Sequence, residues 1–262
     1  MKGVILAGGL GQRLRPMTLV TNKHLLPVFD RPMIYFPIGC LLAAGIDEIL
    51  LVTGGDHAGD FLRLLRNGRH LGIRHLEYAY QEGEGGIADA LRLAEDFADG
   101  EKICVVLGDN ILQYDIRQAA DDFSHQKTGA KVLLKEVDDP QRFGVVRMED
   151  CRIAEIQEKP DQPASNLAVT GIYFYDNSVF EYCNQIHPSH RGELEITDVN
   201  NAYIQRGDMT HDVVEGWWTD AGTIPSLQRA SKLVERDGAN LPREASTQAV
   251  QINSFYQSGT SE

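Results

Sequence analysis

The segment that most constrains the fold lies at the start of the chain, where a short apolar run leads into three closely spaced glycines. Residues 4–7 (Val-Ile-Leu-Ala) have the length and the uninterrupted apolar character of a buried β-strand, and Gly8, Gly9 and Gly11 follow. Glycine is favoured where the backbone must turn sharply or approach another group closely. The pattern therefore predicts a strand that ends in a turn packed against a ligand or another part of the chain.

The charge of this segment narrows the kind of ligand. Residues 1–33 contain five lysines and arginines against Asp30 alone, whereas the whole chain has a formal net charge of −13. Backbone N–H groups of a turn, together with a few cationic side chains, are what a phosphate group needs. The glycine spacing excludes the two commonest phosphate loops, because no Lys-Ser or Lys-Thr follows Gly11 and the order is G-G-x-G rather than G-x-G-x-x-G. We interpret the segment as a polyphosphate site of another type.

Strand and helix patterns alternate after this turn. Strands are predicted at residues 49–53, 75–80, 103–107 and 131–137, and helices at 32–44, 56–66 (with Asp56 as N-cap) and 86–97. Apolar strands alternating with helices predict an α/β fold: a Rossmann-like open, mostly parallel sheet with helices on both faces. Ligands in such sheets lie beyond the carboxyl ends of the strands, so the strand ends at Gly8, Gln81 and Asp109 are predicted to meet in one crevice.

The second part of the chain has a different pattern. Two short strands at 143–147 and 153–156 predict a hairpin, further strands are predicted at 169–175 and 210–214, and helices at 195–204 and at a last segment ending near Gly238. With no linker or internal repeat, we expect one domain over residues 1–238 that carries a small β-rich insertion. The polar, non-periodic residues 239–262 predict a flexible tail.

Composition excludes several classes of protein. No apolar stretch approaches the eighteen residues of a membrane span. The acidic balance argues against nucleic acid and anionic membranes as partners. The four cysteines are scattered without a C-x-x-C pair, which indicates free thiols of a cytoplasmic protein rather than disulfides or a zinc site; they are Cys40, Cys104, Cys151 and Cys183. His24, His57 and His75 lack the spacing of metal ligands and are interpreted as ordinary core or surface residues.

Six motifs in order resemble the signature of the sugar-1-phosphate nucleotidylyltransferases over residues 1–236. The first three are Gly8-Gly9-Leu10-Gly11-Gln12-Arg13-Leu14-Arg15-Pro16, Lys23-His24-Leu25-Leu26-Pro27-Val28 and Arg31-Pro32-Met33-Ile34; Gln12 and Arg31 stand where that family usually has Thr and Lys. The others are Gly108-Asp109-Asn110, Glu158-Lys159-Pro160 and Trp218-Thr219-Asp220-Ala221-Gly222-Thr223. The segment Gln81 to Ala90 also matches, and the resemblance is to the thymidylyltransferase branch in a short form.

The resemblance implies a reaction and an arrangement of the domain. A nucleotidyl group would pass from dTTP or UTP to glucose-1-phosphate, giving dTDP-glucose or UDP-glucose and pyrophosphate. Residues 1–142 would form mainly the nucleotide side and residues 143–238 mainly the sugar side. Longer relatives carry C-terminal helices for oligomer contacts, so whether this chain forms a homo-oligomer stays open.

The resemblance also assigns roles to residues. Asp109 and Asp220 would hold Mg²⁺ together with substrate phosphates, since two carboxylates suffice for magnesium only when the substrate supplies further oxygens. The Gln81 amide has a donor and an acceptor that could pair with O4 and N3–H of thymine or uracil, and Gly86 would let the backbone approach the base. The catalytic set would be Arg13, Lys23, Asp109 and Lys159; the nucleotide set Leu6, Gly8, Gly9, Gly11, Gln81 and Gly86; and the sugar set Asn110, Gly144, Glu158, Lys159 and Val169.

Alternatives remain for these residues and for the whole chain. Asp109 and Asp220 could each be a turn former or a helix cap, and Lys159 a solvated surface charge. The protein could be a pyrophosphorylase for another nucleotide and sugar phosphate, or a non-catalytic regulatory relative that binds nucleotide sugars. We favour the enzyme because all five charged residues of the proposed site are present: Arg13, Lys23, Asp109, Lys159 and Asp220.

Overall fold

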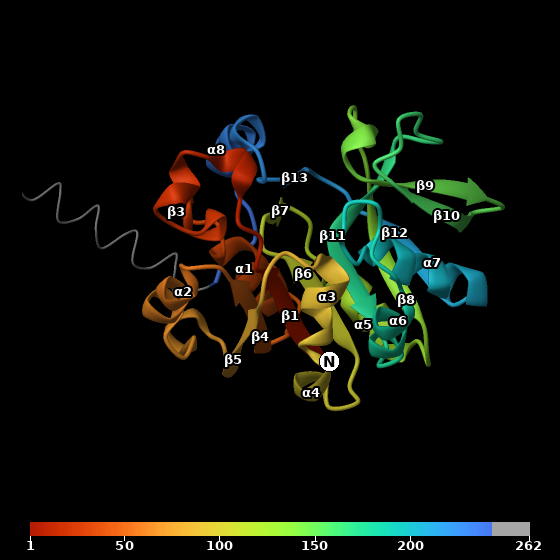
Figure 1. Ribbon diagram of the computed structural model, residues 1–262, viewed down its shortest axis with the longest axis horizontal. Coiled ribbons are helices and arrows are strands. Elements are labelled where there is room, and N and C mark those ends of the chain that lie inside the picture. The colour runs from red at the N-terminus through yellow and green to blue at the C-terminus, as the bar shows by residue number, and fades with distance from the viewer. Residues whose placement is uncertain (243–262) are drawn as a thin grey trace, which may run out of the picture.

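The computed structural model describes residues 1–242, and in them a mixed nine-stranded sheet lies between two layers of helices (Figure 1). The first half of the sheet is parallel, with the strand order β6-β1-β4-β5. Its strands are β1 (Lys2–Ala7), β4 (Glu48–Gly54), β5 (His75–Gln81) and β6 (Ile103–Leu107). The predicted strands of this half are confirmed: β1, β4 and β6 are covered on both faces and apolar at nearly every position, whereas β5 at the edge is only partly buried.

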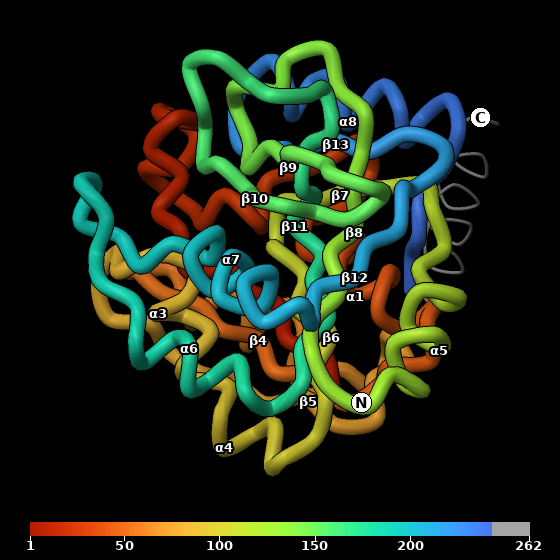
Figure 2. Tube along the Cα trace, turned by 90° about the vertical axis from the view of Figure 1, so that its right-hand side faces the viewer, coloured from red at the N-terminus to blue at the C-terminus, as the bar shows by residue number. Residues whose placement is uncertain are grey.

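The second half of the sheet is joined to the first by antiparallel pairing. Strand β11 (Leu167–Tyr175) runs antiparallel to β6 and to β8 (Ala130–Glu136), and β12 (Met209–Val213) runs parallel to β8. The predicted hairpin is present as β9 (Gly144–Glu149) and β10 (Arg152–Glu158). This hairpin and α7 (Ile196–Arg206) lie at the opposite end of the molecule from α2 (Ala58–Leu65) in Figure 1, and Figure 2 shows them on the side that faces the viewer. The mostly parallel sheet is thus built on the N-terminal half, and the β-rich insertion extends it with antiparallel strands.

Alternate residues of the central strands face two separate layers of the core. Val4 and Leu6 pack in one cluster, while Ile5 and Ala7 pack in the other. The first layer contains α3 (Ile87–Arg92), α4 (Glu95–Ala98), α6 (Val179–Gln185) and α7; the second contains α1 (Tyr35–Ala43), α2 (Ala58–Leu65) and α5 (Arg117–His125). Helices therefore cover both faces of the sheet, as the sequence predicts.

A third, smaller core lies beside the turn that follows β1. It joins the last helix α8 (Ile224–Asp237) to two short strand pairs and to the glycine-rich segment through Leu14, Ile111, Ala221 and Leu227, among others. The pairs are β2 (Pro27–Val28) with β3 (Arg31–Pro32) and β7 (Asn110–Leu112) with β13 (Trp218–Asp220). Short 3-10 turns complete the chain at Gln12–Leu14, Met17–Leu19, Lys23–Leu25, Arg69–Leu71 and Pro140–Arg142.

Several predicted boundaries were wrong for identifiable reasons. The helix predicted from residue 32 begins at Tyr35, because Arg31 and Pro32 pair with β2. Asp56 does not cap α2, whose N-cap is His57 without a side-chain bond. The helix predicted over 86–97 is two short helices, and α5, α6, β7 and β13 were not predicted. Helix α5 buries only three side chains, and β7 and β13 have three residues each, so their patterns are weak.

Residues 239–241, predicted as the start of a flexible tail, are packed against the domain. The Asn240 side chain donates to the Tyr114 carbonyl at 2.8 Å, and Leu241 lies so close to Gly39 of α1 that a Cβ there would be 2.5 Å from its Cα. Residues 239–241 therefore pack on the domain, and 243–262 lie outside the described residues. All four cysteines are free, with Cys151 exposed and the other three buried. Among the described helices, none has the length and apolar character that crossing a membrane requires.

Candidate active site

A cavity of about 700 Å³ opens where the carboxyl ends of β1, β5 and β6 meet the β-rich insertion. The predicted convergence of these three strand ends is confirmed, since Gly8, Gln81 and Asp109 all line it. Every residue predicted as catalytic, nucleotide-binding, sugar-binding or metal-binding lies in its wall. The chain changes direction here: it runs from β1 outward to β4 and β5, and then returns to the other side of β1 with β6, the arrangement that creates binding crevices in α/β sheets.

The glycines after β1 allow two side chains to approach the backbone. A Cβ on Gly8 would lie 2.5 Å from the Gln81 side-chain oxygen. Gly11 has φ +66°, and a Cβ there would lie 2.8 Å from Cβ of Lys23. The Lys23 side chain then passes over the turn, with its Cε 3.4 Å from the Cβ position of Gly9. The turn thus places a lysine ammonium beside exposed backbone, as a phosphate cradle requires.

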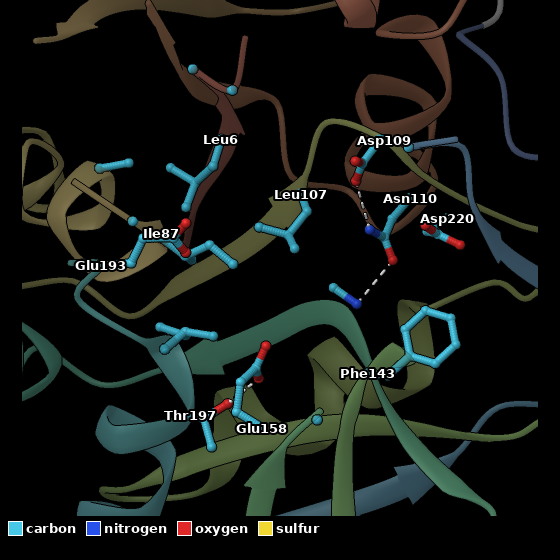
Figure 3. A pocket seen from close by; sticks show the side chains of 18 of the residues that line it. Leu6, Ile87, Leu107, Asp109, Asn110, Phe143, Glu158, Glu193, Thr197 and Asp220 are labelled. Atoms are coloured by element: carbon cyan, nitrogen blue, oxygen red, sulfur yellow. Dashed lines mark hydrogen bonds between the residues drawn. The ribbon is translucent and has the colours of Figure 1, made fainter. Parts of the chain in front are cut away.

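Two carboxylates that are far apart in the chain are brought together by β7 and β13. Asp220 is the cross-strand partner of Asn110, and the N–H of Ala221 donates to the Asp109 carbonyl at 2.8 Å. One oxygen of Asp109 lies 3.3 Å and one of Asp220 lies 3.5 Å from the point that a Cβ of Gly222 would occupy. Figure 3 shows Asp109, Asn110 and Asp220 together on one side of the pocket. The missing side chain at Gly222 thus leaves open the space that both carboxylates face.

Each of these carboxylates has a cationic partner. Lys23 Nζ lies 2.7 Å from Asp109, and Arg142 Nη2 lies 2.9 Å from Asp220. Burial would raise the pKa of Asp109, but Lys23, His24 and a hydrogen bond from Asn110 hold that pKa well below its usual range. The pKa of Asp220 is raised by burial and by the nearby Asp109, against the opposing effect of Arg142.

The donor set fits a magnesium ion completed by substrate. Two carboxylate oxygens face one space, and carboxylate oxygens are ligands that magnesium prefers. Within residues 1–242 no group of three or more His, Cys, Asp or Glu side chains could hold a metal, so the remaining ligands would be phosphate oxygens and water. His24 does not join the set: its ring bonds to the Asn22 side chain at 2.8 Å, and burial, followed by Lys23, lowers its pKa to about 3.

The sugar side of the cavity is organised around Glu158. One of its oxygens accepts a hydrogen bond from Thr197 at 2.7 Å, and the other lies 3.3 Å from Lys159 Nζ and 3.5 Å from Arg191. Figure 3 shows Glu158 and Thr197 side by side at the pocket wall. Lys159 has φ +44°, a conformation that residues other than glycine adopt rarely. A Cβ on Gly144 would lie 3.6 Å from both Glu158 and Thr197, so this glycine keeps the carboxylate open to the cavity.

Asn110 links the two sides. Its side-chain oxygen accepts from the Gly171 N–H at 2.9 Å and from Trp218 at 2.7 Å, and its nitrogen donates to Asp109 at 3.1 Å. The second N–H of the Asn110 amide can donate to a ligand. Asn110 therefore fixes β11, β13 and Asp109 relative to one another, in addition to lining the cavity.

Two interpretations of the base region need revision. Gly86 has φ +99°, and a Cβ there would lie 2.6 Å from the Leu194 carbonyl, so contact with the sugar-side loop already requires glycine. The nitrogen of the Gln81 amide donates to Asp89 at 2.9 Å and to the Gly86 carbonyl at 3.1 Å. The amide therefore offers the cavity its oxygen rather than the predicted donor and acceptor together.

Sequence reasoning assigned no role to four side chains that contact the predicted site residues. Arg142, Arg191, Thr197 and Trp218 line the cavity and contact Asp220, Glu158 or Asn110. Arg142 could have been found by a search for a cation that neutralises the Asp220 carboxylate. Arg191 carries no such signal, because an arginine in a loop is ordinary on its own.

A family model described as nucleotidyl transferase matches residues 2–237. The glucose-1-phosphate thymidylyltransferase of Neisseria meningitidis is 44% identical over 90% of this chain and 83% of its own length. That of an Actinoplanes species is 43% identical over 88% of this chain and 77% of its own.

Solved structures of similar proteins have the same fold as this chain. A Bacillus anthracis protein assigned as a glucose-1-phosphate thymidylyltransferase, crystallised with sucrose, superposes with a TM-score of 0.86 at 52% identity over 90% of this chain and 96% of its own. A UDP-glucose pyrophosphorylase in complex with UDP-glucose shares the fold, with a TM-score of 0.78 at 24% identity over 90% of this chain and 98% of its own.

Proposed function

This chain belongs to the nucleotidyl transferase family and is an enzyme of that type, and on this premise we propose that it joins dTTP and glucose-1-phosphate to form dTDP-glucose and pyrophosphate. Relatives at 40–44% identity carry the name of that activity. The observation that supports the proposal most is the meeting of Asp109 and Asp220 between a lysine-bearing glycine turn and the Glu158-Lys159 pair. A phosphate cradle, a cation site and a second anion site lie in one cavity, as a reaction between two phosphates requires.

In the proposed reaction an oxygen of the sugar phosphate attacks the α-phosphorus of dTTP. A phosphorus–oxygen bond forms there as the bond from the α-phosphorus to the bridging oxygen breaks, and pyrophosphate leaves with the electron pair. No covalent enzyme intermediate is needed. The protein accelerates transfers of this kind chiefly by positioning the two reactants and by stabilising the charge that develops between them.

The nucleotide side would bind the triphosphate through the turn after β1. Gly8, Gly9 and Gly11 expose backbone, and the Lys23 ammonium lies 3.6 Å from the Cβ position of Gly9. Lys23 would leave Asp109 in part and neutralise charge near the α-phosphate. Arg13, whose Nη2 lies 3.3 Å from the Cβ position of Gly222, would hold the leaving pyrophosphate. Leu6 would lie beneath the nucleotide.

The sugar side would bind glucose-1-phosphate through Glu158 and Lys159. Glu158, held by Thr197, would accept hydrogen bonds from sugar hydroxyls, with Gly144, Val169 and the free N–H of Asn110 beside the ring. Lys159 is 43% exposed at its side chain and is available to a phosphate. It would place the attacking oxygen.

Asp109 and Asp220 would hold Mg²⁺ with oxygens of the nucleotide. When bound there, the ion would neutralise phosphate charge and orient the triphosphate. Lys23 and Arg142, which pair with the two carboxylates here, would then turn toward the substrates.

A panel of nucleotides and sugar phosphates tests this function by the release of pyrophosphate. We expect dTTP, followed by UTP, with glucose-1-phosphate to exceed ATP and GTP by at least about tenfold in kcat/KM, since a purine leaves buried polar groups unpaired. Removal of Mg²⁺ with a chelator should stop release, and added Mg²⁺ should restore it. Equal turnover of ATP and dTTP would refute the assignment of the base, and no release with any pair would refute the enzyme.

A further inference from the structure

The amide of Gln81 can be oriented from its neighbours alone. Its nitrogen lies 2.9 Å from an Asp89 carboxylate oxygen and 3.1 Å from the Gly86 carbonyl oxygen. Both partners are acceptors, so the atom between them must be the NH₂ group, whose two hydrogens they use. Turning the amide over would set its oxygen against two other oxygens. The orientation is therefore determined by chemistry and not by a choice between similar atoms.

The other end of the amide faces the cavity. The Gln81 oxygen is the atom that a Cβ on Gly8 would meet at 2.5 Å, and Gln81 lines the cavity while Asp89 does not. A ligand in this position meets an acceptor with both of its donors already engaged. Thymine and uracil carry a hydrogen on N3, whereas cytosine has a lone pair there.

We propose that Asp89 is the positioning residue of the base site: it fixes the Gln81 amide so that the site accepts a hydrogen bond from a ring N–H and selects thymine or uracil over cytosine. This inference rests on the proposed function and adds to it the side chain that sets the preference. Asp89 acts through Gln81 and does not itself touch the base.

The surroundings hold Asp89 in place. Its carboxylate packs against Gly85, where any side chain would collide with it. Its second oxygen lies 3.9 Å from Arg92 of the same helix. The segment that carries it is attached to the sugar-side loop by two backbone bonds, Leu194 N–H to the Gly85 carbonyl at 2.8 Å and Ala88 N–H to the Leu194 carbonyl at 3.1 Å. Asp89 thus has a fixed backbone, a steric limit on one side and a cation on the other.

The decisive variant is Asp89→Asn, which keeps size but can offer either an acceptor or a donor to Gln81. Because the Gly86 carbonyl still accepts, the amide should become able to adopt both orientations rather than reverse. We expect the ratio of dTTP to dCTP, measured both as equilibrium affinity and as kcat/KM, to fall by about threefold to tenfold. The KM for glucose-1-phosphate should stay unchanged. The matched control is Asp96→Asn on the neighbouring helix α4, which removes the same charge from an exposed position and should leave the ratio unchanged.

A second pair of variants tests the orientation directly. Gln81→Glu sets two carboxylates within hydrogen-bond distance and should weaken dTTP binding at least about tenfold. Adding Asp89→Asn should restore part of that binding, because the introduced asparagine can donate to one oxygen of the introduced glutamate while the other oxygen faces the base; the repulsion from the Gly86 carbonyl remains. If the nitrogen of the Gln81 amide contacts the base instead of its oxygen, the double variant should bind dTTP as weakly as Gln81→Glu alone.

The outcomes separate this inference from the proposed function. A dTTP to dCTP ratio that is equal in wild type, Asp89→Asn and Asp96→Asn, with dTTP still turned over, overturns the role of Asp89 and leaves the enzyme intact. A wild type that neither binds nor uses dTTP overturns the proposed function itself. Melting curves confirm that each variant is folded before its ratio is interpreted.

Discussion

The two sides of the cavity are built by different means. On the side proposed to bind the nucleotide, the cavity wall lies at the ends of the parallel strands β1, β5 and β6, and close approach is made by glycines such as Gly8 and Gly11. On the side proposed to bind the sugar phosphate, strands are antiparallel, and the polar groups are side chains held by other side chains, as Thr197 holds Glu158. One side is made mainly of backbone and the other mainly of a side-chain network.

This difference determines how each side should respond to substitution. A backbone site tolerates changes to its side chains but not an added Cβ, whereas a network loses function stepwise as its members are removed. The two acidic residues belong to neither side alone, since Asp109 follows β6 and Asp220 belongs to β13. Asp109 and Asp220 therefore form the junction between the two sides.

The largest effect is expected at the junction. Asp109→Asn and Asp220→Asn should each lower kcat by at least about a hundredfold, and the double variant should be scarcely worse, because groups that act as a unit are not additive. Asparagine keeps the size and capping ability of aspartate, so a purely structural role for either residue predicts active variants. Pyrophosphate release measured against Mg²⁺ concentration distinguishes the two. Asp138→Asn, exposed and outside the cavity, is the control.

The next effect concerns the phosphate of the sugar. Lys159→Ala should lower kcat/KM for glucose-1-phosphate by roughly one to two decades, since a charge-assisted contact contributes about 1.5–3 kcal/mol. Affinity for dTTP measured without sugar should change little. Arg152→Ala, at the exposed start of β10, removes the same charge from the far end of the same strand and should have no effect. An equal loss of dTTP affinity in Lys159→Ala would move the lysine to the nucleotide side.

A matched pair of glycines tests the backbone site. Gly11→Ala and Gly45→Ala both place alanine at a positive φ, +66° and +78°, but only the first Cβ meets other atoms, while nothing lies within 4 Å of the second. Gly45→Ala should lose about 1–2 kcal/mol of unfolding free energy through backbone strain, and Gly11→Ala should lose more because its Cβ also collides with Lys23 and Thr18. Only Gly11→Ala should also lower kcat/KM for dTTP, by roughly tenfold, because Lys23 must shift. Equal activity in the two folded variants would contradict a role for the close approach at Gly11.

The smallest effect is expected in the sugar-side network. Thr197→Val removes the hydrogen bond to Glu158 while keeping shape, and Arg191 remains 3.5 Å away to orient the carboxylate. We expect the KM for glucose-1-phosphate to rise roughly threefold to tenfold with kcat and the KM for dTTP nearly unchanged. Thr170→Val, which removes a buried hydrogen bond to the Leu133 carbonyl, should instead lower the melting temperature. A fall in kcat without a change in either KM would show that Thr197 does not act through sugar binding.

The strands and the turn on the nucleotide side could be predicted from the sequence more readily than several other elements. Strands β1, β4 and β6 of the parallel half could be predicted because each is buried on both faces and so reads as a continuous apolar run, whereas the edge strand β5 is mostly exposed or half-buried. The glycine turn could be predicted because its conformation depends on neighbouring residues in the chain. Helix α5 escaped because most of its residues are polar and two of its three buried side chains are alanines. The break between α3 and α4 escaped because apolar periodicity continues across it.

Local composition, spacing and motif were enough to predict the fold class, the glycine turn after β1 and a set of residues that all line the cavity. How these residues meet depends on the packed molecule. Asp220 reaches Asp109 through two three-residue strands, too short to carry a pattern. Arg142 pairs with Asp220, and Asp89 orients Gln81, through contacts between side chains that the chain alone does not align. Such contacts depend on the direction of each side chain, which is fixed only when the elements that carry it are packed.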